Sequence, residues 1–266
     1  MSKTLPFIIL FYTLFLPVQE CQYEAYFQIT DLAKKQTASE RFTEARANFQ
    51  EAFSQIEFPL GHDLSVALYV ADQTKDFEWA SLLAKKLAMG GAPLRYFSKF
   101  KNRKWYNEFE LKFEEYAKFY KTNFNHELRN RFMVLSRRDI EFTERYHSWR
   151  EGKIEMTLEE LIDGATEIVT EFIRLNEEYG FPDEQKMGYN YVRRKNDIEP
   201  YDILAVVVHI YQRGVLILQD DIPNIVCSGG LHPGYEKTLK QVRGFGNSTG
   251  VEQEMQARYS KYRGDY

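Results

Sequence analysis

The spacing of apolar side chains constrains the fold of this chain more than any other feature, because they recur with the period of an α-helix along most of residues 22–243. In the segment RFTEARANFQEAFSQIEF the apolar positions are Phe42, Ala45, Phe49, Ala52, Phe53 and Ile56. This spacing places the six side chains on one face of a helix. Pro59 and Gly61, two helix breakers, then end the segment. The same pattern returns in a second block after residue 122, so the sequence predicts an all-α protein.

The first block contains a repeat. Ala45, Phe49 and Ala52 recur 35 residues later as Ala80, Ala84 and Leu87. Tetratricopeptide repeats have a period of about 34 residues, and residues 22–122 resemble a degenerate pair of such hairpins. The resemblance implies stacked antiparallel helix pairs, with the aromatic helix around Trp105 covering their open flank.

The second block predicts a helical-bundle domain at residues 123–243. Thr157 and Glu160 have the spacing of a capping box at a helix start. Gly180 and Pro182 stand where that helix must end. Residues 244–266, with their glycine-rich start and charged end, predict a flexible tail.

The stretch ILAVVVHIYQRG, residues 203–214, is almost wholly apolar. By periodicity alone, residues 203–208 are compatible with a buried strand or a buried helix. We favour a helix, because a lone strand would have no pairing partner among helices and because Pro200 suits the start of a helix. A sheet through 203–208 would overturn the all-α prediction.

The N-terminus predicts export. Lys3 is followed by an apolar run too short to cross a bilayer, and residues 1–21 therefore have the pattern of a signal peptide. A lipid-modified Cys21 and an uncleaved anchor are the alternatives. The only other cysteine is Cys227, so loss of Cys21 with the signal would leave no internal disulfide, and Cys227 would then act as a small apolar residue. We expect a periplasmic or cell-envelope location, with membrane contact only through the uncleaved N-terminal segment.

Charge and motif content exclude several function classes. Lys and Arg number 35 against 39 Asp and Glu, a net charge of −4, which offers no general attraction to nucleic acid. The five histidines lack the short spacings of metal-binding helices, and no G-x-S-x-G or P-loop motif occurs. The sequence therefore predicts no nucleic-acid partner, no metal, no cofactor and no catalytic residue of a known motif.

Six polar residues form the candidate site: His209, Gln212, Arg213, Asp139, Arg145 and His232. Gln212 and Arg213 follow His209 by three and four residues, so all three share one helix face. If the others converge there, Arg213 can bind a carboxylate with two donors while His209 acts as donor or base. The alternative is structural: His209 donates to a buried carboxylate such as Asp139 and joins two helices.

A wider resemblance covers the last half of the chain. The residues that carry it are Asp139 and Arg145 in RRDIEFTER, the Gly180-Phe181-Pro182 turn, Gly188 and His209. With the export signal and the hairpins before them, they resemble a family of exported bacterial proteins of unknown function. The resemblance implies export and a helical C-terminal domain, and it implies no reaction.

These patterns favour a non-enzymatic helical-repeat module that binds a protein or peptide partner, because stacked helix pairs form grooves for such partners. An enzyme or small-ligand-binding protein centred on His209, Arg213 and Asp139 is the first alternative. A structural or immunity-type partner of another exported protein is the second.

Overall fold

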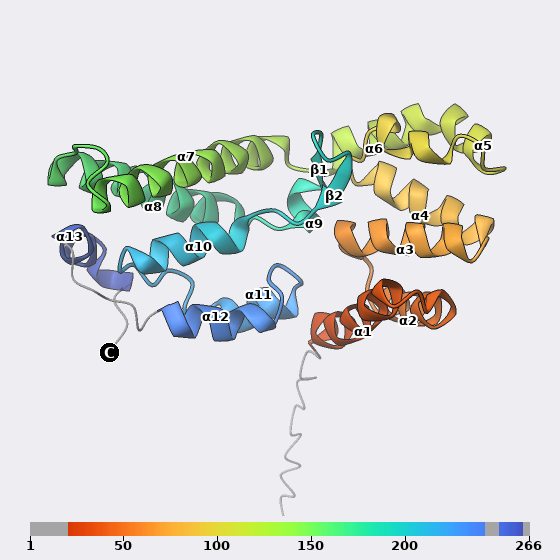
Figure 1. The fold of residues 1–266 in the computed structure, drawn as a ribbon, viewed down its shortest axis with the longest axis horizontal. Coiled ribbons are helices and arrows are strands. Elements are labelled where there is room, and N and C mark those ends of the chain that lie inside the picture. The colour runs from red at the N-terminus through yellow and green to blue at the C-terminus, as the bar shows by residue number, and fades with distance from the viewer. Residues whose placement is uncertain (1–20, 243–249, 263–266) are drawn as a thin grey trace, which may run out of the picture.

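The computed structural model describes residues 21–242 and 250–262. In these ranges the chain is helical apart from turns and one small hairpin, which confirms the all-α prediction. Figure 1 shows the N-terminal helices α1–α6 on one side of the molecule and α7–α13 on the other. Within these ranges no helix combines the length and the hydropathy that crossing a membrane requires.

The N-terminal half begins with two helix pairs and ends with three shorter elements. The pairs are α1 (Gln22–Ala38) with α2 (Phe42–Ser54), and α3 (Gly61–Gln73) with α4 (Phe77–Met89). The 3-10 helix η1 (Leu94–Phe100), α5 (Tyr106–Leu111) and α6 (Phe113–Asn123) follow, and α5 and α6 both pack on α4. The last of them ends beside the predicted boundary at residue 122.

Small side chains lie where these helices meet. The repeated residues are all buried on the second helix of each pair: Ala45, Phe49 and Ala52 on α2, and Ala80, Ala84 and Leu87 on α4. Ala67 and Ala71 are buried on α3 opposite α4, so the backbones of these two helices can approach closely. The two hairpins are thus observed, whereas their tetratricopeptide-like character stays a prediction.

The C-terminal half is built on two long helices, α7 (His126–Arg150) and α8 (Leu158–Tyr179). Thr157 and Glu160 form the predicted capping box at the start of α8. The short helix α9 (Glu184–Met187) leads to a hairpin of β1 (Asn190–Val192) and β2 (Asp197–Glu199), which pair antiparallel with Tyr191 opposite Ile198. Then follow α10 (Ile203–Gln212), α11 (Ile222–Cys227), α12 (Gly234–Val242), α13 (Gly250–Arg258) and the 3-10 helix η3 (Ser260–Tyr262).

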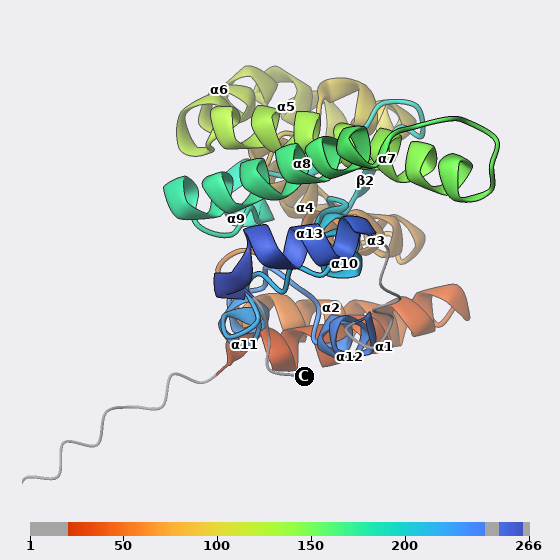
Figure 2. The ribbon, with the colours of Figure 1, turned by 90° about the vertical axis from the view of Figure 1, so that its left-hand side faces the viewer.

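The apolar stretch at 203–208 is helical, as predicted. It forms α10, whose Ile203, Val206, Val207 and Ile210 are buried in the C-terminal core. Figure 2 shows α7 and α8 as a layer above α10 and α13, and contacts join α10 to α7 and α13 to α8. An all-apolar helix suits this position because neighbours cover most of its surface.

Residues 250–262, predicted to belong to a flexible tail, instead form α13 and η3. Val251 and Met255 of α13 are buried in the C-terminal core, and the Tyr262 carbonyl oxygen accepts a hydrogen bond from the Leu216 N–H at 3.0 Å. The core therefore extends beyond its predicted end at residue 243. The remaining tail positions, 244–249 and 263–266, lie outside the described residues.

The two halves share a junction that the division at residue 122 did not predict. Tyr189 and Ile198, from the C-terminal half, are buried in the N-terminal core beside α3 and α4. Gly188 precedes them with φ +74°, and a Cβ there would lie 2.7 Å from the Gly90 carbonyl oxygen. That same oxygen accepts a hydrogen bond from the Tyr189 N–H at 2.7 Å. Only glycine permits this backbone contact between the halves.

A disulfide between Cys21 and Cys227 also joins the halves, which corrects the expectation that Cys227 is a free, apolar residue. That expectation followed from the loss of Cys21 with the signal peptide, and the cleavage itself stays a prediction. Cys21 directly precedes α1 and Cys227 ends α11, and these two helices pack together with Cα atoms of the cysteines 4.6 Å apart. Residues 1–20 of the predicted signal lie outside the described residues.

The junction also buries a carboxyl group, Glu184 of α9. Its Oε2 accepts a hydrogen bond from the Gly61 N–H, at the start of α3, at 2.7 Å. Burial raises the pKa of Glu184 to about 8; the Gly61 N–H opposes this rise, and the charges of Asp63 and Asp183 add to it. The folded protein therefore holds a proton on Glu184 at neutral pH.

We predict that the free energy of unfolding falls between pH 4.5 and pH 8 through this one group. In that window the unfolded chain releases the proton at its ordinary pKa of 4.5, whereas the folded chain keeps it. Rising pH therefore favours the unfolded state by up to about 1.4 kcal/mol per pH unit, and the loss levels off above pH 8. Glu184→Gln keeps an oxygen for the Gly61 N–H without the charge. Urea unfolding at a series of pH values should show a flatter profile for this variant and higher stability at pH 8.

The control is Glu114→Gln, which removes an exposed carboxylate on α6. It should leave the slope between pH 4.5 and 8 unchanged. Equal slopes for the native chain and Glu184→Gln would contradict the prediction.

Candidate functional site

Three of the six predicted site residues meet between α7 and α10. Asp139, in the middle of α7, has a side chain only 1% exposed. Its Oδ2 lies 2.5 Å from His209 Nδ1, and its Oδ1 accepts a hydrogen bond from Arg213 Nη2 at 2.8 Å. His209 lies in the last turn of α10, and Arg213 is the C-cap residue that directly follows this helix. A charged cluster thus joins the two helices inside the C-terminal half.

The hydrogen-bond pattern defines which atoms of the cluster remain available. An ionised carboxylate only accepts hydrogen bonds, so His209 Nδ1 carries the proton in its bond to Asp139. Thr143 Oγ1 lies 3.3 Å from the same nitrogen and 3.2 Å from Arg213 Nη2. Arg213 Nη1 is buried without a hydrogen-bond acceptor in the described part of the chain, and His209 Nε2 likewise makes no hydrogen bond there.

Arg213 is held as a buried cation. Its side chain is 9% exposed, and its guanidinium carbon lies 4.7 Å from the centroid of the Phe142 ring. Burial lowers the pKa of Arg213, and the adjacent Asp139 carboxylate opposes that shift. The ring and the carboxylate together replace part of the water that the guanidinium loses.

A cavity of about 260 Å³ lies beside the cluster. His209, whose side chain is 22% exposed, borders it together with Gln212 and Arg213. The other lining residues come from α7 and α13: Phe142, Thr143, Tyr146, His147, Arg150, Val251 and Glu252. Gln212 therefore joins the predicted site as a wall of the cavity. Asp139 lies behind the other residues and does not border the cavity.

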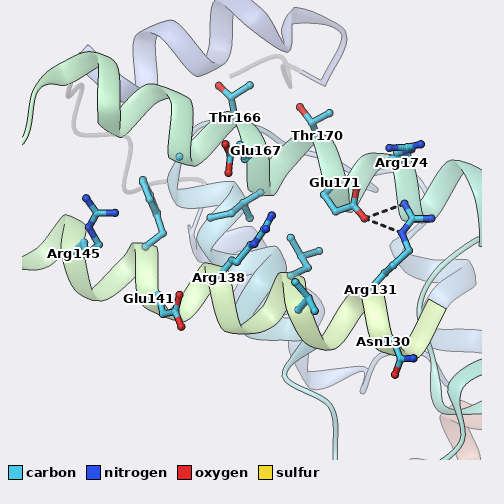
Figure 3. Close-up of a pocket in the computed structure, with 15 residues that line it drawn as sticks. Asn130, Arg131, Arg138, Glu141, Arg145, Thr166, Glu167, Thr170, Glu171 and Arg174 are labelled. Atoms are coloured by element: carbon cyan, nitrogen blue, oxygen red, sulfur yellow. Dashed lines mark hydrogen bonds and ion pairs between the residues drawn. The ribbon is translucent and has the colours of Figure 1, made fainter. Parts of the chain in front are cut away.

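The structure does not bring His232 or Arg145 into this cluster. His232 Nε2 lies 3.0 Å from Asp31 Oδ2 of α1, so this histidine joins the C-terminal half to the first helix. Arg145 projects from α7 toward α8 instead of toward α10 (Figure 3). The prediction that all six residues converge is therefore wrong for these two. Residues 139, 142, 143 and 146 share one face of α7, whereas 145 lies on another.

A second hollow, about 800 Å³, runs along the seam between α7 and α8; we call it the α7/α8 groove. Its floor is apolar, with Leu135, Phe142 and Ile168 buried beneath the partly exposed Val134. Gly164 of α8 allows the close approach that forms this floor, since a Cβ there would lie 2.7 Å from the Phe142 ring. The same ring borders the cavity beside Arg213, so Phe142 forms part of the wall of both hollows.

Four arginines line the groove: Arg131, Arg138, Arg145 and Arg174. Arg131 is neutralised by Glu171 at 2.9 Å and Glu178 at 2.7 Å. The other three are exposed and form no ion pair with any residue that the structure describes. Figure 3 shows Arg138 and Arg145 extending from α7 toward the α8 side of the groove. Three guanidinium groups are thus open to an incoming partner.

The sequence contains a pattern of arginines that indicates this groove, and the sequence analysis did not recognise it. Arg131, Arg138 and Arg145 are seven residues apart, which places them on one face of α7 over four turns. Their meaning depends on α8, because only the packing of α8 shows that they border a groove. Glu184 had no comparable signal, since its burial depends on α3, more than one hundred residues earlier.

In the ranges 21–242 and 250–262, no three His, Cys, Asp or Glu side chains are arranged to hold a metal ion. No protein-family model, no curated protein and no solved structure matches this chain.

Proposed function

We propose that this chain is a non-enzymatic binding protein of the cell envelope or periplasm, and that the α7/α8 groove receives a segment of a partner protein. The observation that carries the proposal is the combination of an apolar floor with three arginines that pair with no described residue, along one open seam. A groove of this kind suits an amphipathic segment, whose apolar face covers the floor while its polar face meets the rim.

The charges of the groove indicate the chemistry of that segment. The lining carries four Arg and three Glu, an excess of one positive charge on a chain whose net charge is −4. Because Glu171 is already paired with Arg131, an acidic segment would meet three guanidinium groups and the two carboxylates of Glu141 and Glu167. Guanidinium binds carboxylate with two parallel hydrogen bonds, which adds geometric specificity. We therefore expect a partner segment with carboxylates along one edge of an apolar stripe.

The proposed location is supported by the disulfide. Disulfides persist in oxidising compartments such as the periplasm and are rare in the cytosol. A signal peptide that ends before Cys21 is compatible with a mature chain that keeps the Cys21–Cys227 bond. The resemblance to exported proteins with tetratricopeptide-like hairpins is also part of the proposal. In this proposal the N-terminal half is a rigid support for the C-terminal half.

Fluorescence anisotropy with designed peptides tests the proposal. The probe is a labelled amphipathic peptide with a leucine stripe flanked by glutamates, and its matched control has lysines in place of the glutamates. We expect the acidic peptide to bind and the basic one to bind at least about tenfold more weakly, with the difference shrinking at high salt.

The variant that tests the site is Arg138→Gln combined with Arg145→Gln and Arg174→Gln. We expect about a tenfold loss of affinity for the acidic peptide, since three exposed ion pairs are removed. The matched control replaces Arg193, Arg194 and Lys195, three exposed cations of the β1–β2 turn, by glutamine. If both triple variants bind the acidic peptide as the native chain does, or if the two peptides bind alike, the groove is not its site.

A further inference from the structure

The cavity beside Arg213 is separate from the groove and has a different chemistry. Around it, both oxygens of Asp139 and the Nδ1 of His209 are already hydrogen bonded. His209 Nε2 and Arg213 Nη1 are left without a partner in the part of the chain that the structure describes. A buried cation with an unused donor is costly in a folded protein, so such a group needs an explanation.

The rim of this cavity is rich in hydrogen-bond donors. Gln212 contributes an amide, His147 an imidazole and Arg150 a guanidinium. Arg150 is exposed and lies over the Tyr146 ring, with its guanidinium carbon 6.0 Å from the ring centroid. Among the described residues, Glu252 is the one carboxylate that borders the cavity, and it has a partner of its own.

One part of the wall is apolar, formed by the Phe142 ring and the buried Val251. Inorganic anions such as phosphate gain nothing from such a wall, whereas an organic acid can place its apolar body there. A volume of about 260 Å³ is below the usual range of sites for larger ligands, about 300–1,000 Å³. The occupant must therefore be small.

We propose that this cavity binds a small monocarboxylate, with its apolar body against Phe142 and Val251 and its carboxylate toward Gln212 and Arg150. The carboxylate accepts hydrogen bonds from the Gln212 amide and from the Arg150 guanidinium, which closes the entrance, and the His209 ring borders the bound acid. Asp139 and Arg213 are positioning residues: Asp139 orients His209, and Arg213 supplies the buried positive charge behind it. Binding is non-covalent and involves no reaction. This site is independent of the partner segment proposed for the groove.

Ligand titration of the full chain tests the proposal. Histidine imidazole signals are followed by NMR while butyrate or benzoate is added, and butyramide, benzamide and inorganic phosphate serve as comparisons. We expect the carboxylates to shift the His209 signals with a dissociation constant of about 1 mM or tighter. The neutral amides and phosphate should bind at least about tenfold more weakly. Equal binding of acids and amides, tighter binding of phosphate, or no shift of His209 with any ligand would overturn the proposal.

Variants at the exposed rim test the site without disturbing the buried cluster. Arg150→Gln and Gln212→Ala should each weaken benzoate binding by about fivefold to tenfold, because each removes a donor to the carboxylate. The control is Arg193→Gln, which removes an exposed cation of the β1–β2 turn that borders neither hollow, and it should leave benzoate affinity unchanged. Benzoate affinity that stays constant in both rim variants would show that the acid binds elsewhere. The rim variants should also bind the acidic peptide normally, so that failure of one proposal can be distinguished from failure of the other.

Discussion

Asp139→Ala is expected to lower the free energy of unfolding by about 3–5 kcal/mol. The substitution leaves Arg213 as a buried cation without its carboxylate, in a place where no described residue offers an acceptor to its Nη1. It also removes the carboxylate acceptor of His209 Nδ1, which leaves only the longer contacts of Thr143 to join α7 to His209 and Arg213 among the described residues. Urea unfolding followed by circular dichroism measures the loss.

Two comparisons separate this cause from a general effect of mutating α7. Glu141→Ala changes an exposed carboxylate two residues away and should cost less than about 0.5 kcal/mol. Replacing the whole cluster, as Asp139→Leu with His209→Leu and Arg213→Met, should recover much of the stability because no charge is left buried. If Asp139→Ala is no more harmful than Glu141→Ala, the cluster does not stabilise the fold.

Breaking the Cys21–Cys227 disulfide is expected to cost about 2–4 kcal/mol. The bond closes a loop of 206 residues, nearly the whole described chain, and so restricts the unfolded ensemble strongly. In the folded state it fixes the start of α1 against α11. The urea midpoint of Cys227→Ser should therefore lie well below that of the oxidised native chain.

Three cysteine variants should be equally stable, and this comparison shows whether the lost stability comes from the disulfide itself. Cys21→Ser, Cys227→Ser and the double variant should have equal stability and should not respond to reductant, whereas the native chain should lose stability on reduction. The intact mass of the native protein should be two hydrogen masses lower before reduction than after it. Alkylation of both cysteines in unreduced, folded protein would contradict the pairing.

The helices could be predicted because their signals are local. The capping box of Thr157 and Glu160 lies within four residues, and the apolar stripe of α2 within fifteen. The choice of helix for residues 203–208 depended on the neighbours, and it was right because α7 and α12 cover α10. The hairpin at 190–199 was missed because its strands are only three residues long and because β2 packs on α3, which is distant in the sequence.

The candidate site could be predicted only in part, because some of its contacts are local in the sequence and others join distant residues. His209, Gln212 and Arg213 share a helix face, so their grouping followed from the sequence. Asp139 was a correct choice among many acidic residues, whereas Arg145 and His232 were assigned by chemistry alone and lie elsewhere. Nothing within a few residues of His232 indicates that its partner is Asp31, 201 residues earlier.

The sequence by itself determined that this chain is helical, where α8 begins and ends, and which face of α2 is apolar, because backbone hydrogen bonding and side-chain periodicity act over a few residues. The tertiary structure alone decided that Cys21 meets Cys227, that Glu184 is buried against Gly61, and that Asp139 lies between His209 and Arg213. These contacts join residues 70 to 206 positions apart. They form only when whole helices pack, and that packing depends on the shape and burial of many side chains at once.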